Sequence, residues 1–156
     1  MTKPGPEVLF YQLSGTTLDA TLPDLLERSL ARGWRVIVRC GSEAGVAGLD
    51  TLLWTYADES FLPHGTAAAG NAALQPVYLT LGEENPNGAN ILMLVDGARA
   101  TPAEMAGFER TCLLFDGRDD RAVETARADW RAVRAAALPA KYWVREHGKW
   151  VQKASS

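Results

Sequence analysis

The stretch "TCLLFDGRDDRAVETARADWRAVRAAAL" covers residues 111–138 and joins two patterns that have different periods. Residues 111–117 are mostly apolar, which is typical of a buried β-strand. From Asp119 onward, apolar side chains recur about every three to four positions among charged ones, which predicts a long helix that Pro139 ends. A buried strand that runs directly into a helix is the repeating unit of α/β proteins.

Strand and helix patterns also alternate along the rest of the chain. Further strands are expected over residues 8–13, 34–40, 76–81 and 90–97, and further helices over residues 21–33, 43–56 and 101–110. Because several strands are almost wholly apolar, we expect helices on both faces of a mostly parallel sheet. The connection 82–90 is too short for a parallel crossover, so strands 76–81 and 90–97 are predicted to be antiparallel neighbours. The expected fold is a three-layer α/β sandwich with an antiparallel edge.

The chain length favours one domain over residues 1–156, with a flexible N-terminus (1–7) and a C-terminal arm (139–156). The first residues do not have the pattern of a signal peptide, and no run of about 18 apolar residues indicates a membrane span. Cys40 and Cys112 have neither a CxxC nor a Cys/His spacing. We therefore expect buried, reduced thiols in a cytoplasmic protein.

Charge is unevenly distributed along the chain, whose formal net charge is −3. Residues 1–115 hold 7 basic and 13 acidic side chains, whereas residues 116–156 hold 9 basic and 6 acidic ones. An acidic body is a poor surface for duplex nucleic acid. The basic C-terminal part can instead capture an acidic partner.

A glycine-rich turn, "GSEAGVAG" (41–48), lies between a predicted strand and a predicted helix, where a nucleotide-phosphate loop would lie. Its glycine spacing does not match the dinucleotide pattern, no Lys follows its last glycine, and Asp50 would repel a phosphate. His64 has no nucleophile signature near it, and two histidines with two isolated cysteines do not make a zinc site. No catalytic residue, metal site or cofactor is predicted.

The helix 119–138 has the pattern that points most clearly to binding. Three arginines fall within about 60° of one another beside its apolar face, namely Arg127, Arg131 and Arg134. Trp130 lies at the border between these arginines and the apolar face of the helix. Two readings stay open: a solvated face that pairs with Glu124 and Asp129, or one side of a site that takes an apolar anchor and holds a carboxylate.

A second unusual stretch is "DTLLWTYADESFLPHG" (50–65), in which a helix gives way to a loop. The stretch places Trp, Tyr and Phe at this junction. Large apolar groups there are either core beneath a long loop or a surface that a partner covers.

Taken in order, four parts of the chain resemble the chi subunits of bacterial DNA polymerase III. The matching segments are "VLFYQL" (8–13), "GLDTLLWTYADESFLPHG" (48–65), "NILMLVDG" (90–97) and the last helix "ARADWRAVRAAAL" (126–138) with "YWV" (142–144). The segment L-W-x(5)-S-F-L-P-H, residues 53–64, is the most specific of them. The resemblance runs from about residue 8 to about residue 143.

The resemblance implies a Rossmann-like fold and an accessory subunit of the DNA polymerase III holoenzyme that has no activity of its own. Proteins of this family join the clamp loader through a small partner, psi. They also bind the acidic C-terminal tail of the single-stranded-DNA-binding protein, which ends in an aromatic residue and a free carboxylate. By this resemblance, the psi surface corresponds to Trp54, Phe61, Leu62, Pro63 and His64. The tail site corresponds to Arg127, Trp130, Arg131, Arg134, Leu138 and Trp143.

Two functions of other classes are weighed against this adaptor. A nucleotide-dependent enzyme would use the turn 41–48, and the missing Lys and the acid at Asp50 oppose it. A direct nucleic-acid binder would use the basic C-terminal part. The net charge of −3 and the lack of a recognisable strand studded with aromatic residues oppose that reading. We therefore expect contact with nucleic acid only through a partner, and no contact with a membrane.

Overall fold

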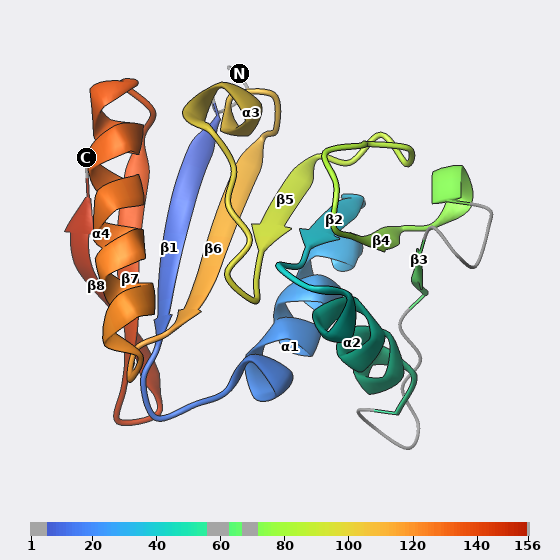
Figure 1. The fold of residues 1–156 in the computed structure, drawn as a ribbon, viewed down its shortest axis with the longest axis horizontal. Helices are drawn as coiled ribbons and strands as arrows, with labels where there is room; N and C mark the ends of the chain where they lie inside the picture. Colours follow the sequence, from blue (N-terminus) through green and yellow to red (C-terminus); the bar gives the residue numbers. More distant parts are fainter. Residues whose placement is uncertain (1–5, 56–62, 67–71, 156) are drawn as a thin grey trace.

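The computed structural model describes residues 6–55, 63–66 and 72–155, and these form one sheet in the order β3-β4-β2-β5-β6-β1-β7-β8 (Figure 1). The strands are β1 (Glu7–Leu13), β2 (Val36–Arg39), β3 (Gly65–Thr66), β4 (Val77–Thr80), β5 (Ile91–Leu94), β6 (Arg110–Asp116), β7 (Ala140–Glu146) and β8 (Lys149–Ser155). All neighbouring pairs are parallel except β7 and β8, which are antiparallel. The predicted mostly parallel sheet with an antiparallel edge is confirmed.

Helices cover both faces of the sheet. They are α1 (Leu18–Ala31), α2 (Glu43–Thr55), α3 (Pro102–Met105) and α4 (Asp120–Ala135), with a 3-10 turn η2 (Ala72–Leu74) before β4. Leu22 of α1 and Leu53 of α2 are buried in one apolar core, whereas Met105 of α3 and Val133 of α4 are buried in a second core. We call the two sides of the sheet the α1 face and the α4 face. The three layers confirm the predicted α/β class, and the arrangement is consistent with a Rossmann-like fold.

One strand pairing was predicted wrongly. β4 and β5 lie on either side of β2 and both are parallel to it, so they are not antiparallel neighbours. Each of these strands has 4 residues, so the return path along the sheet is only about 13 Å. The connecting residues 81–90 span that distance easily without a helix. The antiparallel pair lies at the other end of the sheet instead.

The C-terminal segment forms part of the sheet, although the sequence pattern indicated an arm with a frayed end. Residues Ala140–Glu146 pair with β1 as β7, and Lys149–Ser155 pair with β7 as β8. The turn between them contains His147 and Gly148, both with positive φ. A two-residue connection of this type matches the twist of an antiparallel hairpin.

The helix α4 is shorter than the predicted range 119–138 but begins where the sequence indicates. The Asp119 side chain accepts hydrogen bonds from the backbone N–H groups of Arg121 and Ala122, which caps the first turn. The helix ends at Ala135, because Ala137 adopts a left-handed conformation with φ 61° before Pro139. Among the described residues, no helix is long and apolar enough to cross a bilayer.

Candidate functional site

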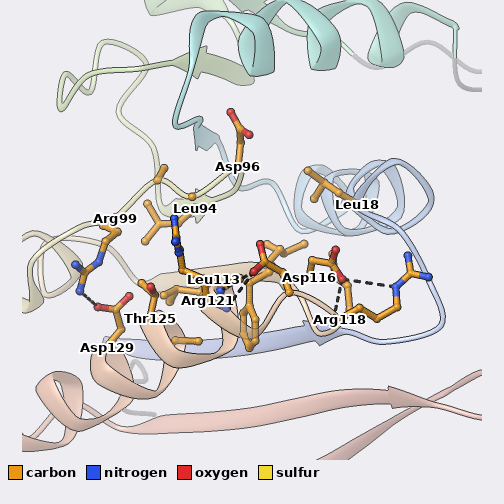
Figure 2. A pocket seen from close by; sticks show the side chains of 18 of the residues that line it. Leu18, Leu94, Asp96, Arg99, Leu113, Asp116, Arg118, Arg121, Thr125 and Asp129 are labelled. Carbon is orange, nitrogen blue, oxygen red and sulfur yellow. Dashed lines mark hydrogen bonds and ion pairs between the residues drawn. The ribbon is translucent and has the colours of Figure 1, made fainter.

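A cavity of about 690 Å³ opens at the carboxyl ends of β1, β5 and β6, between the starts of α1 and α4 (Figure 2). The connection after β1 leads to the α1 face and the connection after β6 leads to the α4 face, so this is a switch point of the sheet, where open α/β folds bind ligands. Two arginines at its rim lie close to carboxylates of the cavity lining. Arg99 forms an ion pair with Asp129, and Arg118 lies 3.8 Å from Asp116.

The glycine-rich turn at the start of α2 is filled by a carboxylate of the chain itself. The Ser42 hydroxyl donates a hydrogen bond to Asp96 Oδ2 over 2.6 Å, and Figure 2 shows the Asp96 side chain turned towards α2. A Cβ at Gly41 would overlap the Asp96 carbonyl oxygen, and one at Gly45 would overlap its carboxylate. The place that a phosphate would take at this helix start therefore already holds a negative group, which argues against the nucleotide reading.

At the end of α2, the Trp54 side chain is exposed to solvent, with 55% of the residue accessible. Its ring meets the His64 ring edge-on with 5.3 Å between centroids. His64 itself is buried, and its Nε2 lies 2.9 Å from Asp50 Oδ1. Pro63 is exposed, whereas Phe61 and Leu62 lie outside the described residues. The structure therefore brings Trp54 and His64 together, with His64 as the support beneath an exposed ring.

The helix α4 presents the α4 arginine surface, which we define as the exposed residues Arg127, Arg131 and Arg134. Asp129, which the solvated-face reading pairs with these arginines, binds Arg99 instead. In the part of the chain that the structure describes, no carboxylate forms an ion pair with any of the three. Three guanidinium groups on one helix are therefore available to an anionic partner.

Trp130 connects this surface to the core. Its ring meets Phe10 of β1 edge-on at 5.3 Å and Tyr142 of β7 at 5.9 Å. Leu138 packs against the same core. The Tyr142 hydroxyl donates a hydrogen bond to Gln12 Oε1 over 2.6 Å. Burial raises the pKa of Tyr142, and the positive charge of Arg127 opposes that rise.

Trp143 is the one member of the predicted tail site that lies apart from the rest. It pairs in register with Tyr11, whereas Tyr142 pairs with Phe10 and packs beneath α4. Because successive side chains of a strand point to opposite faces, Trp143 lies on the α1 face. Tyr142, and not Trp143, therefore lies against Trp130 beneath α4.

The aromatic strands at this end of the sheet were not predicted from the sequence. Lys141, Trp143 and Arg145 alternate with inward-facing residues along β7 and share one face. Trp150 on β8 pairs with Arg145. The period-two pattern was present in "AKYWVRE" (140–146), but Pro139 and the polar end of the chain made the segment resemble an arm.

Comparison with known proteins gives consistent results. Residues 6–141 match the family described as "DNA polymerase III chi subunit, HolC". A segment of 47 residues is 40% identical to the "Probable DNA polymerase III subunit chi" of Rickettsia prowazekii and covers 30% of this chain and 28% of that protein. A segment of 90 residues is 33% identical to the "DNA polymerase III subunit chi" of Pseudomonas aeruginosa and covers 58% of this chain and 61% of that protein.

These alignments span less than two thirds of each relative's length, but the family match extends from the start of β1 to the start of β7. It includes α2 with Trp54 and the whole of α4 with its arginines. The resemblance noted in the sequence is confirmed: the chain belongs to the family of DNA polymerase III chi subunits.

Proposed function

We propose that the protein is an accessory subunit of DNA polymerase III in bacterial DNA replication, with no catalytic activity of its own. In this role it links the clamp loader, through psi or another clamp-loader component, to the acidic C-terminal tail of the single-stranded-DNA-binding protein. Family membership supports the replication role. The observation that carries the adaptor role is the set of three arginines on α4 that no described carboxylate neutralises.

The tail site consists of the α4 arginine surface together with the aromatic residues beside it. An arginine holds a carboxylate through charge-assisted hydrogen bonds, which contribute roughly 1.5–3 kcal/mol each. Burial of the terminal aromatic ring of the tail adds about 1.5–3 kcal/mol. Ordering a flexible tail opposes both contributions, so we expect a dissociation constant of about 1 μM.

We assign the clamp-loader site to Trp54, Phe61, Leu62, Pro63 and His64, of which Phe61 and Leu62 lie outside the described residues. A half-exposed Trp held by a buried His resembles the rigid aromatic anchors that dominate protein interfaces. Trp54→Ala should weaken assembly with the clamp loader by about 2 kcal/mol or more and leave the fold intact. Val151→Ala, which removes an exposed apolar side chain at the opposite edge of the sheet, serves as the control.

The adaptor role is tested by titrating the protein with a labelled tail peptide, its C-terminal amide and a peptide that lacks the last aromatic residue. Arg131→Ala should weaken binding of the free acid about tenfold, and the amide should lose a similar factor. Arg118→Ala removes an exposed arginine outside the α4 arginine surface and should bind like the wild type. If the amide binds as well as the free acid, arginine does not hold the carboxylate and the tail site is wrong.

A further inference from the structure

The β7–β8 hairpin carries a second charged and aromatic surface on the face opposite the α4 arginines. We define the hairpin platform as Lys141, Trp143, Arg145 and Trp150. Trp143 pairs in register with Tyr11 of β1, and Arg145 pairs with Trp150. Residues paired in this way share a face of the sheet, so the four side chains lie together on the α1 face.

On the α1 face, the main helix contacts of the described residues lie over other strands. α1 packs mainly over β2 and β6, and α2 packs over β4 and β3. Figure 1 shows α4 as the helix beside β7 and β8, and it covers the other face. Tyr11 and Trp150 pack against the core of the α1 face, and Trp143 and Trp150 are only partly buried.

The two tryptophans of the platform are held differently. The Trp150 ring meets Tyr11 edge-on at 5.2 Å, and the Arg145 guanidinium lies over it at 5.5 Å. Trp143 belongs to neither apolar core, and among the described residues it makes no ring–ring or cation–π contact. Its ring is therefore not paired with another ring of the described chain, and it shares a face of the hairpin with a ring that is already held in place.

Positive groups flank the rings. Lys141 and Arg145 lie two residues to either side of Trp143 on the same strand, about 7 Å away along the chain. Two acidic groups on this face are paired with arginines: Glu7 binds Arg110 at 2.8 Å and Asp24 binds Arg28 at 3.2 Å. The platform thus presents a positive surface with aromatic rings, on a chain whose overall charge is −3.

We propose that the hairpin platform binds single-stranded DNA directly. Unpaired bases stack on aromatic side chains irrespective of sequence, while Lys and Arg contact the phosphates on either side. Duplex DNA does not fit this chemistry, since its bases are stacked inside the helix. Direct nucleic-acid binders use strands that carry aromatic residues. Such a pattern was not recognised in the sequence, but it is present here in β7 and β8. Binding at this platform goes beyond the adaptor role, because it needs no partner protein.

The test measures quenching of tryptophan fluorescence by an oligothymidylate of about 12 nucleotides in salt of about 50 mM. Wild-type protein should show saturable binding that weakens as salt rises. Trp143→Ala should lose about tenfold in affinity, and Trp143→Phe should keep most of it, because a phenyl ring still stacks. Arg145→Gln should lower the slope of the log–log salt plot by about 0.7. Binding by the variants is followed by anisotropy of a labelled oligonucleotide.

The matched control is Arg131→Gln on the α4 face, which should bind the oligonucleotide like the wild type while losing the tail peptide. Trp143→Ala should lose affinity for the oligonucleotide and bind the tail peptide like the wild type. Failure of the platform and failure of the tail site can therefore be distinguished. The proposal is overturned if the oligonucleotide does not bind at low salt. It is equally overturned if Arg131→Gln and Arg145→Gln reduce DNA binding to the same extent, or if Trp143→Ala loses the peptide and keeps the DNA.

Discussion

At the scale of single residues, Asp96 determines what the glycine-rich turn at the start of α2 can accommodate. Its backbone is in the left-handed region with φ 53°, directly after β5 and the buried Val95. This conformation turns its carboxylate towards Ser42 and close to Gly45. The glycines at this turn thus make room for a side chain of the chain itself.

Two glycines of α2 provide a matched pair for this contact. A Cβ at Gly45 would overlap the Asp96 carboxylate, whereas a Cβ at Gly48 meets no atom within 4 Å. Gly45→Ala should therefore lower the free energy of unfolding by about 1–2 kcal/mol, because it breaks the Ser42–Asp96 hydrogen bond. Gly48→Ala should raise it by about 0.5–1 kcal/mol, because alanine favours a helix. Urea denaturation of both variants measures the difference, and equal shifts would contradict the account.

The buried thiols give a dependence of stability on pH. Burial, with a smaller effect of Asp96, raises the pKa of Cys40 from 9.0 to about 12, and burial raises the pKa of Cys112 to about 12. Below about pH 9 both thiols are protonated in the folded and in the unfolded protein. The stabilisation that the protonated thiols provide is therefore complete there. Between about pH 9 and 12 the unfolded chain loses protons that the folded chain keeps, and each thiol reduces stability by about 1.4 kcal/mol per pH unit.

This dependence is measured by urea denaturation at several pH values for the wild type and for Cys40→Ala. The substitution removes one titrating thiol, so stability should fall less steeply with pH in the variant than in the wild type. Identical slopes would show that Cys40 ionises normally in the folded protein.

At the scale of elements, α4 has two roles on its two sides. Its inner side places Trp130 against Phe10 and Tyr142, and its outer side presents the α4 arginine surface. The helix therefore fixes the arginines relative to the sheet through a tryptophan that packs on two strands. A site built on a rigid helix loses little entropy when a peptide binds.

Because Trp130 packs on both strands, its removal should affect folding more than binding. We expect Trp130→Ala to lower the free energy of unfolding by about 3 kcal/mol, through the lost contacts and the space left behind. Trp130→Phe should cost less, because a phenyl ring retains the edge-on contact with Phe10. Thermal or urea denaturation gives the stabilities, and peptide titration of the folded fraction gives the affinity. A Trp130→Ala protein with unchanged stability would show that the ring is a surface group.

At the scale of the whole molecule, the two proposed partner surfaces lie towards opposite ends of the sheet (Figure 1). Trp54 ends α2, which packs beside β3 and β4, whereas the arginines lie on α4 beside β7. Six of the eight strands separate β3 from the last strand in the order of the sheet. An adaptor with sites so placed can hold two partners at once, and each weak contact gains from the other.

Separate sites predict independent effects. Trp54→Ala should leave the affinity for the tail peptide unchanged, and Arg131→Ala should leave assembly with the clamp loader unchanged. In the double variant the two losses in binding free energy should add to within about 0.5 kcal/mol, because distant sites without shared contacts do not couple. Calorimetry with each partner alone checks this. A coupling well above that limit would mean that the two partners share a surface.

The sequence by itself determined the class of fold and the family. Almost wholly apolar strands such as "NILMLVDG" (90–97) must be covered on both faces, which requires helices on both sides of a parallel sheet. The amphipathic pattern of residues 119–138 placed Trp130 at the border between core and arginines, and the structure confirms that position. These inferences succeeded because hydrophobic periodicity is a local property of the chain.

Only the tertiary structure decided which side chains meet. Three contacts join residues that lie far apart in the chain. They are the pairing of β5 with β2, the contact of Asp96 with the glycine turn and the ion pair of Arg99 with Asp129. The strand register likewise placed Trp143 on one face and Tyr142 on the other. The periodicity of a strand shows that successive side chains point to opposite faces. Which of them faces α4 depends on the pairing of β7 with β1. A local sequence pattern does not contain such long-range pairing.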